Sequence, residues 1–545
     1  MSRLSIDDLR RFDEAARLIY DPRSPRAFST KILATARRSR PALAVGLLLI
    51  GIFASALRAQ TNEERDARVE AILPALQKTL DQYRRTTRTP GVAVAVVTPD
   101  NAWFLNSGRR RVSSPATVCE CTAFQLASVS KAITGTYAAR LVTLGRLDWN
   151  DRIARLLPWF AFASPSVTSQ ITVLDLLTQR SGLPGGAGNI LEDLGYGQRT
   201  VLDSMRLIDP APNFRKAFSY VNFGITLGGV SAARTTAWPF PTSVSRTLFQ
   251  PLGMVRTTAD YRHFLRQRNR AQMNYVLDGR AEPRFVRDAQ AQAPAGGVSS
   301  DTDDLSRLMQ MYLNEGLVDG KPFLSRSAFK RMISPITPIN SFPDGSSVSY
   351  GVGWFVRTTK DGLHTVFHAG TFVGARTILS FRPAQKIGIV VLANATPGLP
   401  PEAIEDAFYQ LYDTGRVKRH TLQTAIHNTL PPSSLAPLNR VIKSSPNLGA
   451  QVNGRPLSAY AGVYANAYLG NFTIAQTPGG LSLTVGPEQP AMPLRFNQSD
   501  SELYVLNRSG DFFKLEFLDF DGARFAALHV PAADDVEWGF LQRTK

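Results

Sequence analysis

Apolar residues between positions 63 and 84 recur every three or four residues, the spacing of one helix face. They are Val69, Ile72, Leu73, Leu76, Leu80 and Tyr83. This spacing predicts an amphipathic helix with Pro74 as a point of kinking. The period then changes to that of a strand, because residues 91–97 form a continuous, largely β-branched run. A turn rich in Pro, Asp and Asn follows, and residues 102–106 are predicted to return as a second strand.

The middle of the chain, residues 130–335, is mostly helical in pattern, and strand patterns return after it. The later strands are predicted at residues 348–357, 364–368, 376–381 and 386–392, followed by a helix at 401–413. That helix is expected to bury Ile404, Phe408 and Leu411. Since strands lie at both ends of a helical middle, the expected class is α+β, with one antiparallel sheet flanked by helices and a helical subdomain.

The last ninety residues change character again and are predicted to be entirely β. A linker rich in Pro, Ser and Asn is expected at residues 431–454. Beyond it come eight short strand patterns, at residues 462–464, 472–475, 481–485, 494–496, 503–506, 513–518, 525–530 and 536–541. Strands this short and this regularly spaced predict a small antiparallel barrel within residues 455–545, separate from a domain at residues 60–430.

The N-terminal region reads as a targeting segment rather than as part of the fold. Residues 41–57 are apolar, follow Arg37, Arg38 and Arg40, and end in an Ala-Ser-Ala pattern. Within residues 41–59 this predicts a signal peptide or an uncleaved signal-anchor helix, with residues 1–40 as a basic cytoplasmic region. The rest of the chain is then expected to be periplasmic or extracellular, free or held at the inner membrane by residues 41–57. A buried core helix is the alternative.

The net charge of +18 over 545 residues raises the question of a nucleic-acid partner. Residues 1–40 account for part of it, with ten Lys or Arg against five Asp or Glu, and the rest is scattered. The cluster Arg109, Arg110 and Arg111 lies outside any nucleic-acid-binding motif, so no nucleic-acid partner is predicted. The two cysteines, Cys119 and Cys121, are too few for a zinc module, and two unpaired thiols are expected because a bridge across one residue is strained.

The first candidate for chemistry is Ser128-Val-Ser-Lys131, at the start of a predicted helix. At a separation of three residues, the Ser128 hydroxyl and the Lys131 amine share one helix face, within hydrogen-bond reach. Burial and the helix N-terminus are expected to lower the lysine pKa, so that the amine accepts the serine proton. Alone the pattern is weak, because a solvated lysine beside a capping serine has the same spacing.

The second candidate is Tyr220-Val-Asn222, in which a phenol and an amide lie two residues apart on one side of an extended segment. A neighbouring lysine is expected to lower the pKa of Tyr220, which suits it to act as a general base and acid. Asn222 is expected to hold a substrate amide. The alternative is a loop tyrosine anchored by its hydroxyl.

The third candidate is His368-Ala-Gly370-Thr371 on a predicted strand. Gly370 is expected to leave room for a substrate backbone. The backbone N–H groups of Thr371 and Ser128 together are expected to form an oxyanion hole. A single histidine is more often structural, so this motif gains meaning only beside the other two.

The order of the three motifs resembles the serine β-lactamase and penicillin-binding protein superfamily, in its branch of class C β-lactamases, esterases and D-aminopeptidases. The neighbourhoods agree at residues 124–131, 176–184, 250–254 and 295–300, and the resemblance covers residues 65–415. It implies that Ser128 is the nucleophile, Lys131 its activator and Tyr220 the general base and acid. It further implies that Asn222 positions substrate and that His368 opens the third motif. The tail from Leu457 resembles the lipocalin-like β domain fused to such hydrolases.

One departure bears on the substrate. β-Lactamases usually carry a lysine where this chain has His368, and a fixed cation there binds the carboxylate of β-lactams. The expected function is therefore an exported, metal-independent serine hydrolase that needs no cofactor and acts on an ester or a D-amino-acid-containing amide. The substrate is expected to be a small molecule or peptide. The alternatives are a true β-lactamase or D,D-peptidase, and a catalytically silent membrane scaffold.

Overall fold

A computed structural model describes residues 61–545 apart from 284–285, 430–447, 450, 487–490, 498–501 and 507–511. The predicted targeting segment at 41–57 and most of the predicted linker at 431–454 lie outside these residues. Within the described part of the chain, no helix combines the length and apolar character needed to cross a membrane.

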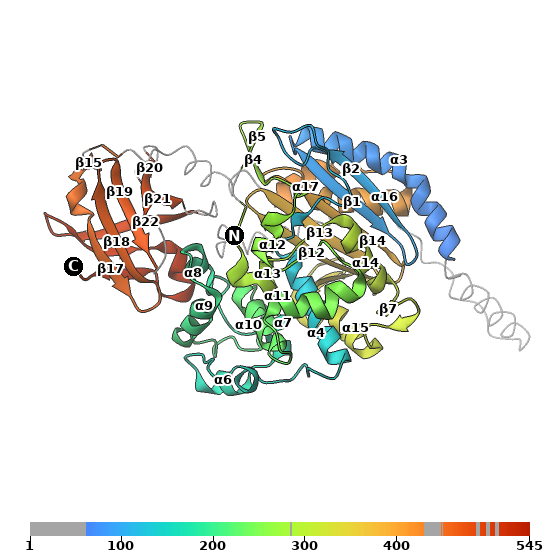
Figure 1. Ribbon diagram of the computed structural model, residues 1–545, viewed down its shortest axis with the longest axis horizontal. Helices are drawn as coiled ribbons and strands as arrows, with labels where there is room; N and C mark the ends of the chain where they lie inside the picture. The colour runs from blue at the N-terminus through green and yellow to red at the C-terminus, as the bar shows by residue number, and fades with distance from the viewer. Residues whose placement is uncertain are drawn as a thin grey trace, which may run out of the picture.

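The centre of the hydrolase region is an eight-stranded antiparallel sheet, in the order β2-β1-β14-β13-β12-β11-β10-β9 (Figure 1). Its strands are β1 (Gly91–Val97), β2 (Ala102–Gly108), β9 (Thr337–Ser341), β10 (Ser347–Tyr350), β11 (Phe355–Thr358), β12 (His364–Phe372), β13 (Ala375–Arg382) and β14 (Ile387–Ala393). The two ends of the region therefore meet where β1 pairs with β14, as the α+β prediction requires.

Both faces of this sheet are buried, which explains the continuous apolar run of β1. Alternate residues Val92, Val94 and Val96 pack toward α3 (Asn62–Thr86) and α16 (Pro401–Thr414). Ala93, Ala95 and Val97 belong to the core on the opposite face, against α4 (Val129–Thr143) and α14 (Thr302–Leu313). A strand covered on both sides has no polar alternation. The predicted helix around Pro74 is confirmed and runs through the proline, and α17 (Thr421–Thr429) follows α16.

The helical middle of the chain is confirmed, with short strands inserted between helices. Its remaining helices are α5 (Ile153–Leu156), α6 (Pro165–Gln170), α7 (Val173–Leu177), α8 (Asn189–Asp193), α9 (Gln198–Ser204), α10 (Asn222–Ala233), α11 (Phe240–Val244), α12 (Tyr261–Arg266), α13 (Ala293–Gly296) and α15 (Arg326–Ile333). The inserted strand pairs are β3 (Phe124–Gln125) with β6 (Ser299–Ser300), β4 (Asn274–Leu277) with β5 (Arg280–Pro283), and β7 (Leu317–Val318) with β8 (Lys321–Pro322).

One strand prediction is wrong, and its failure matters for the site. Residues 348–357 were expected to form a single strand, but they form parts of β10 and β11 joined by a tight turn. Gly351 and Gly353 break the run, and the Gly351 N–H donates to the Trp354 carbonyl at 2.7 Å. Gly353 has a φ of +79°, and a Cβ there would lie 2.2 Å from the Lys131 carbonyl oxygen. The turn therefore packs its backbone directly against α4.

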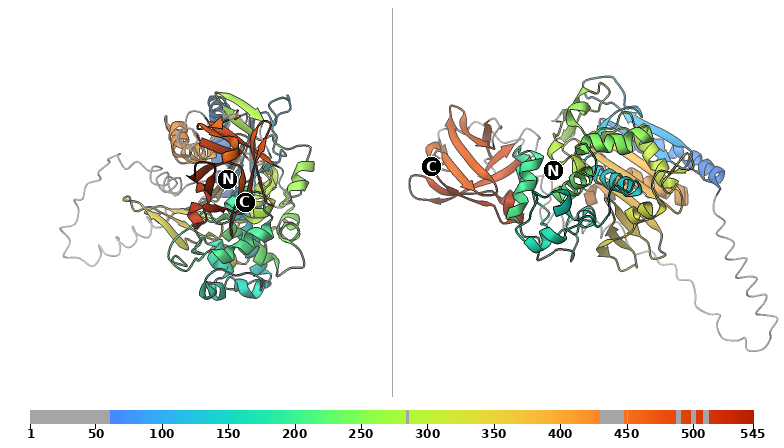
Figure 2. Two further views of the ribbon diagram at one scale, coloured as in Figure 1. Left: turned by 90° about the vertical axis from the view of Figure 1, so that its left-hand side faces the viewer. Right: turned by 60° about the horizontal axis from the view of Figure 1, so that its bottom comes forward.

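The C-terminal region forms the predicted barrel, closed by eight strands. They are β17 (Gly462–Asn466), β18 (Gly470–Thr477), β19 (Gly480–Val485), β20 (Met492–Asn497), β21 (Glu502–Leu506), β22 (Phe512–Phe520), β23 (Phe525–His529) and β24 (Phe540–Arg543). A hairpin of β15 (Gln451–Val452) and β16 (Arg455–Pro456) precedes it. The last strand begins later than predicted, because a 3₁₀ turn occupies Pro531–Val536. The barrel stands at one end of the molecule beside α8 and α9 (Figures 1 and 2).

Candidate active site

Ser128 lies at the entrance to α4, where the chain turns sharply from β3 into the helix. Ala127 makes this turn with a φ of +48°, in the left-handed region that residues other than glycine seldom adopt. Ser128 is 5% exposed and Lys131 is fully buried one helical turn later. The Lys131 Nζ lies 2.9 Å from the Ser128 Oγ and donates to the Ala295 carbonyl at 2.9 Å. The expected contact between hydroxyl and amine is therefore present, and a third group fixes the amine.

Burial of Lys131 lowers its pKa well below the ordinary value of a lysine, as the sequence predicted. Desolvation is the main cause, because the charged ammonium loses its water. The carboxyl group of Glu192 acts in the opposite direction and raises the pKa. A lysine with a lowered pKa holds a neutral amine over more of the pH range, and a neutral amine accepts a proton from a serine hydroxyl.

Tyr220 lies beside the same pair, but its pKa is the reverse of the one expected. The Lys131 Nζ is 4.7 Å from the centre of the tyrosine ring, and the phenol hydrogen-bonds Ser128. Desolvation raises the pKa of Tyr220, and the hydrogen bond to Ser128 offsets only part of that effect. The prediction of a lowered pKa is wrong because it counted the nearby amine and left out the loss of water around the phenolate. Tyr220 therefore holds its proton and is suited to donate it.

Asn222 is the first residue of α10 and is 1% exposed. Its Nδ2 donates to the Oδ1 of Asn189, the first residue of α8, at 3.2 Å. The chain just before Asn222 is held by Gln179, whose Oε1 accepts the Val221 N–H at 2.9 Å and whose backbone carbonyl accepts the Ser219 N–H at 2.9 Å. Sequence reasoning missed both Gln179 and Asn189. Gln179 lay inside one of the matched neighbourhoods, but its spacing carried no chemical signal.

His368 is a buried member of β12 with both ring nitrogens engaged. Since a carbonyl oxygen only accepts, the Nδ1 carries the proton and donates to the Ala369 carbonyl at 2.7 Å. The Nε2 then accepts from the Tyr350 hydroxyl at 3.1 Å. Desolvation, and after it the charge of Lys131, lower the pKa of His368 to about 3. The imidazole therefore stays neutral at working pH, and Tyr350 is a partner that the sequence did not indicate.

The packing around Gly370 leaves no room for a side chain. A Cβ at this position would lie 2.2 Å from the Leu126 carbonyl oxygen and 3.0 Å from the Ser128 nitrogen. A side chain at this position would therefore collide with the chain that leads into Ser128. The place of a substrate backbone beside Gly370 stays a prediction. The next residue, Thr371, is exposed. It lies in the part of β12 after Phe367, which no longer pairs with β11. Its share in an oxyanion hole stays a prediction.

The two cysteines do not match their expectation. Cys119 and Cys121 form a disulfide, with their Cα atoms 5.2 Å apart, inside the range that such bridges span. A turn closed by the Thr122 N–H on the Cys119 carbonyl brings them together, and the Asn269 amide contacts both sulfur atoms. No group of side chains suited to hold a metal ion occurs among the described residues.

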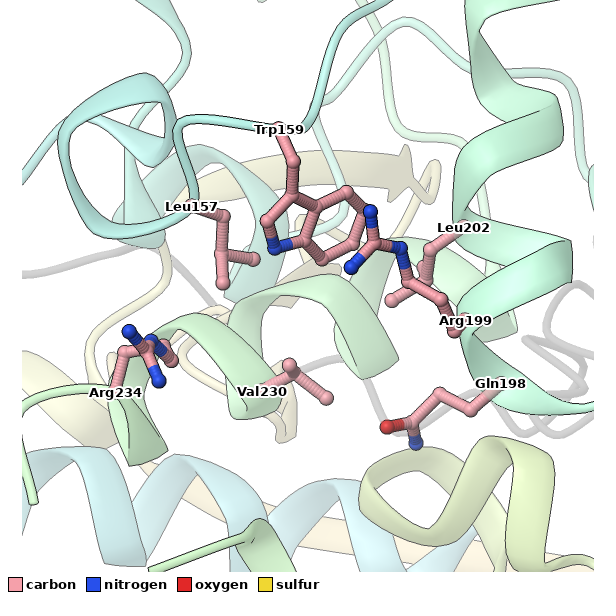
Figure 3. Close-up of a pocket in the computed structure, with 7 residues that line it drawn as sticks. All are labelled: Leu157, Trp159, Gln198, Arg199, Leu202, Val230 and Arg234. Atoms are coloured by element: carbon pink, nitrogen blue, oxygen red, sulfur yellow. The ribbon is translucent and has the colours of Figure 1, made fainter. Parts of the chain in front are cut away.

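A cavity of about 370 Å³ lies in the helical region (Figure 3), and none of the predicted site residues lines it. Its lining comprises Leu157, Trp159, Gln198, Arg199, Leu202, Val230 and Arg234. The Arg199 guanidinium stacks 3.7 Å from the centre of the Trp159 ring and pairs with Asp203 at 2.8 Å. These contacts are local to the cavity wall and reach none of the groups around Ser128.

The model of the Beta-lactamase family matches residues 76–414, more than half of the chain. The chain belongs to the Beta-lactamase family. A curated relative, protein flp of Staphylococcus aureus strain MW2, is 27% identical over 349 residues. That match covers 62% of this chain and 66% of the relative, so the chain spans about two thirds of the relative's length.

Solved structures agree with the family. A D-stereospecific amidohydrolase from a Streptomyces species superposes with a TM-score of 0.52 at 18% identity, covering 63% of this chain and 99% of that one. A β-lactamase/D-alanine carboxypeptidase from Pseudomonas syringae gives a TM-score of 0.52 at 21% identity, covering 64% and 99%. At these identities the likeness shows a shared Beta-lactamase fold.

Proposed function

We propose that this member of the Beta-lactamase family is an exported serine hydrolase that forms an acyl-enzyme on Ser128. Its proposed substrates are esters or amides that contain a D-amino acid. The observation that carries the proposal is the fully buried Lys131, with its Nζ 2.9 Å from the Ser128 Oγ. Burying a lysine costs free energy of folding, and strongly altered pKa values are concentrated at functional sites. This argues against a catalytically silent scaffold.

The geometry supports a division of labour between the two titratable groups. The neutral Lys131 amine takes the proton of Ser128 while the Oγ bonds to the substrate carbonyl carbon. Tyr220, which retains its proton, gives it to the departing alcohol or amine as the carbonyl–heteroatom bond breaks. The proton held on Lys131 then restores the phenol. Water attacks the acyl-enzyme and reverses these transfers, releasing the acid and free Ser128.

The substrate side of the site is neutral and aromatic. His368 carries no charge at working pH, so the third motif offers no cation to a substrate carboxylate. Phe218 and Phe355 are partly exposed beside it, with Phe355 5.2 Å from the His368 ring and 6.3 Å from Tyr220. Such a wall favours neutral or apolar groups over anions. The D-stereospecific amidohydrolase among the structural neighbours supports the amide branch of the proposal.

A substrate series tests this proposal against the β-lactamase and D,D-peptidase alternatives. We would measure kcat/KM for a neutral p-nitrophenyl ester, a D-aminoacyl p-nitroanilide and anionic nitrocefin between pH 5 and 8. A neutral substrate should be preferred throughout, with no swing toward nitrocefin in acid, because the pKa of His368 is about 3. A preference for nitrocefin at pH 8 would overturn the proposal.

The variant His368→Lys sharpens the same series. A lysine there should shift preference toward nitrocefin by roughly 1–3 kcal/mol, the value of one charge-assisted hydrogen bond. An unchanged preference would mean that the third motif does not meet the substrate carboxylate, which removes this argument for neutral substrates.

Export is the part of the proposal that rests on residues 41–57. Alkaline phosphatase fused after Pro90 should be active if the chain after residue 60 lies outside the cytoplasm. Fusions that are expressed but inactive would return residues 41–57 to the status of a core helix.

A further inference from the structure

The barrel contacts the hydrolase region through hydrogen bonds to α8 and the residues around it. The Tyr468 hydroxyl accepts the Gly188 N–H at 2.9 Å. The Tyr196 hydroxyl donates to the Leu469 carbonyl at 3.1 Å. Figures 1 and 2 show the barrel beside α8 and α9 from different sides. The contact with Gly188 differs from the other, because it falls on the residue that immediately precedes Asn189.

Gly188 caps the N-terminus of α8 with a φ of +82°. A Cβ there would lie 2.6 Å from the Phe223 ring and 2.8 Å from the Val201 side chain, so the residue is wedged between α10 and α9. The next residue, Asn189, accepts the Asn222 amide at 3.2 Å. A displacement of Gly188 therefore moves Asn189 directly, and with it the hydrogen bond between Asn189 and Asn222.

The barrel side of this contact is equally fixed. Tyr468 is 4% exposed and also hydrogen-bonds Ser204, at the end of α9. The Oδ1 of Asn466 accepts the N–H groups of Tyr468 and Leu469 at 3.0 and 2.7 Å. The Asn466 Nδ2 donates to the Trp538 carbonyl at 2.8 Å, and the Trp538 ring stacks on Tyr468 at 6.3 Å. The Tyr468 hydroxyl thus lies on a turn that is held by Asn466 on one side and by the Trp538 ring on the other.

We propose that Tyr468 is a positioning residue of the active site. Through Gly188 it sets the place of Asn189, and through Asn189 the direction of the Asn222 amide that holds the substrate. This inference rests on the proposed function, which it deepens by giving the barrel a part in substrate recognition. The barrel then affects substrates that offer an amide to Asn222, and leaves alone reagents that need only Ser128 and Lys131.

Two matched tyrosine variants separate positioning from general docking. Each of Tyr468→Phe and Tyr196→Phe removes one hydroxyl at the same interface. The Tyr468 hydroxyl bonds Gly188 and Ser204, and the Tyr196 hydroxyl bonds the Leu469 carbonyl. For N-acetyl-D-alanine p-nitroanilide, whose acetamido group offers Asn222 an amide apart from the scissile bond, Tyr468→Phe should raise KM about five- to tenfold, as expected for one weakened hydrogen bond. Tyr196→Phe should leave KM near that of the wild type. Both should keep the wild-type rates with p-nitrophenyl acetate and a fluorophosphonate, and their melting temperatures should agree.

A double variant tests whether Tyr468 acts on Asn222 through Asn189. Once Asn189→Ala has removed the asparagine contact, adding Tyr468→Phe should raise KM no further, since residues on one path give non-additive effects. Equal KM values for the two tyrosine variants, or additive effects with Asn189→Ala, would overturn the positioning role.

Failure of the proposed function would give a different result, in the substrate preference of the wild type. A wild type that hydrolyses nitrocefin but neither the anilide nor the ester contradicts the proposed substrate class. The same variants are then compared with nitrocefin, whose acylamino side chain presents an amide to Asn222. A raised KM confined to Tyr468→Phe would still support the positioning role, and equal KM values would again overturn it.

Discussion

Two parts of the candidate active site are built in different ways. The nucleophile corner, made of Ser128, Lys131, Ala295 and Gly370, is buried and closed by backbone groups in direct contact. The recognition rim, made of Gln179, Asn189 and Asn222, is assembled from loop ends and helix starts by side-chain amides. The corner belongs to one close-packed unit of α4, α13 and the sheet. The rim lies next to a contact with the barrel, where the Tyr468 hydroxyl accepts the Gly188 N–H.

The difference separates what chemistry requires from what recognition requires. Proton transfer needs a fixed distance and a dry environment, which close packing supplies. Substrate choice needs a surface that can differ between relatives, and loops tolerate change better than a packed sheet does. Substitutions in the corner should therefore affect every substrate alike, and those in the rim should act on some substrates and not others.

The largest expected effect is in the corner. Ser128→Ala should abolish fluorophosphonate labelling and lower turnover of every substrate by about a thousandfold or more, because the nucleophile is lost. Labelling followed by mass spectrometry measures this directly. A variant that keeps a tenth of the wild-type rate would contradict the assignment.

Ser130→Ala is the control for that loss. The Ser130 Oγ accepts the buried Val298 N–H at 3.0 Å, whereas the Lys131 Nζ contacts Ser128. Removing it should lower the free energy of unfolding by about 1–3 kcal/mol, the cost of an unsatisfied buried amide. Labelling of Ser128 should persist at close to the wild-type rate.

An intermediate effect is expected from Gly370→Ala. The added methyl would collide with the Leu126 carbonyl, so β12 or the turn before Ser128 has to move. We expect a loss of about 1–3 kcal/mol in unfolding free energy and a kcat lowered for all substrates alike. Gly479→Ala, where a Cβ meets nothing within 4 Å, should change stability by no more than about 0.5 kcal/mol. Full activity in Gly370→Ala would show that the corner is less rigid than described.

The smallest expected effect concerns Glu192, which lies in the same helix as Asn189 of the rim and acts on the pKa of Lys131 in the corner. Glu192 lies in α8, pairs with Arg287 at 3.0 Å, and raises the pKa of Lys131. Glu192→Gln removes that negative charge, so the pKa of Lys131 falls further and its neutral form persists to lower pH. The acid limb of the labelling rate against pH should therefore move to lower pH.

Glu405→Gln supplies the matched change, because Glu405 is also buried but lies in α16, on the other face of the sheet. Its loss should leave the acid limb in place. A limb that stays put or moves to higher pH in Glu192→Gln would mean that the α8 charge does not reach the lysine.

Most of the fold could be predicted from local patterns. β1 begins and ends where its apolar run does, and the barrel strands follow the turn residues between them. β9 was missed because it contains Pro338 and lacks an apolar run, so its strand character comes from pairing with β10. The break between β10 and β11 was missed because apolar residues surround Gly351 and Gly353 and mask the turn.

The site residues divide in the same way, into those with local contacts and those whose contacts are distant in the sequence. Ser128 and Lys131 could be found because their contact spans three positions of one helix. The contacts of Gln179 with Val221 and of Asn189 with Asn222 cross 42 and 33 positions, and no local pattern records them. The pKa of Tyr220 was misjudged for a related reason, since desolvation is the sum of many distant neighbours.

The pairing of β1 with β14 has a consequence for how the protein is made. Ser128 and Lys131 leave the ribosome early, but Gly370 and His368, which close the corner, follow about 240 positions later. At about 5–20 residues per second this is a delay of tens of seconds. During that time β1 also lacks its neighbour β14, so the sheet under α4 cannot form. The nascent chain therefore carries Ser128 and Lys131 before the sheet that completes their surroundings, and we expect labelling of Ser128 only once the domain is complete.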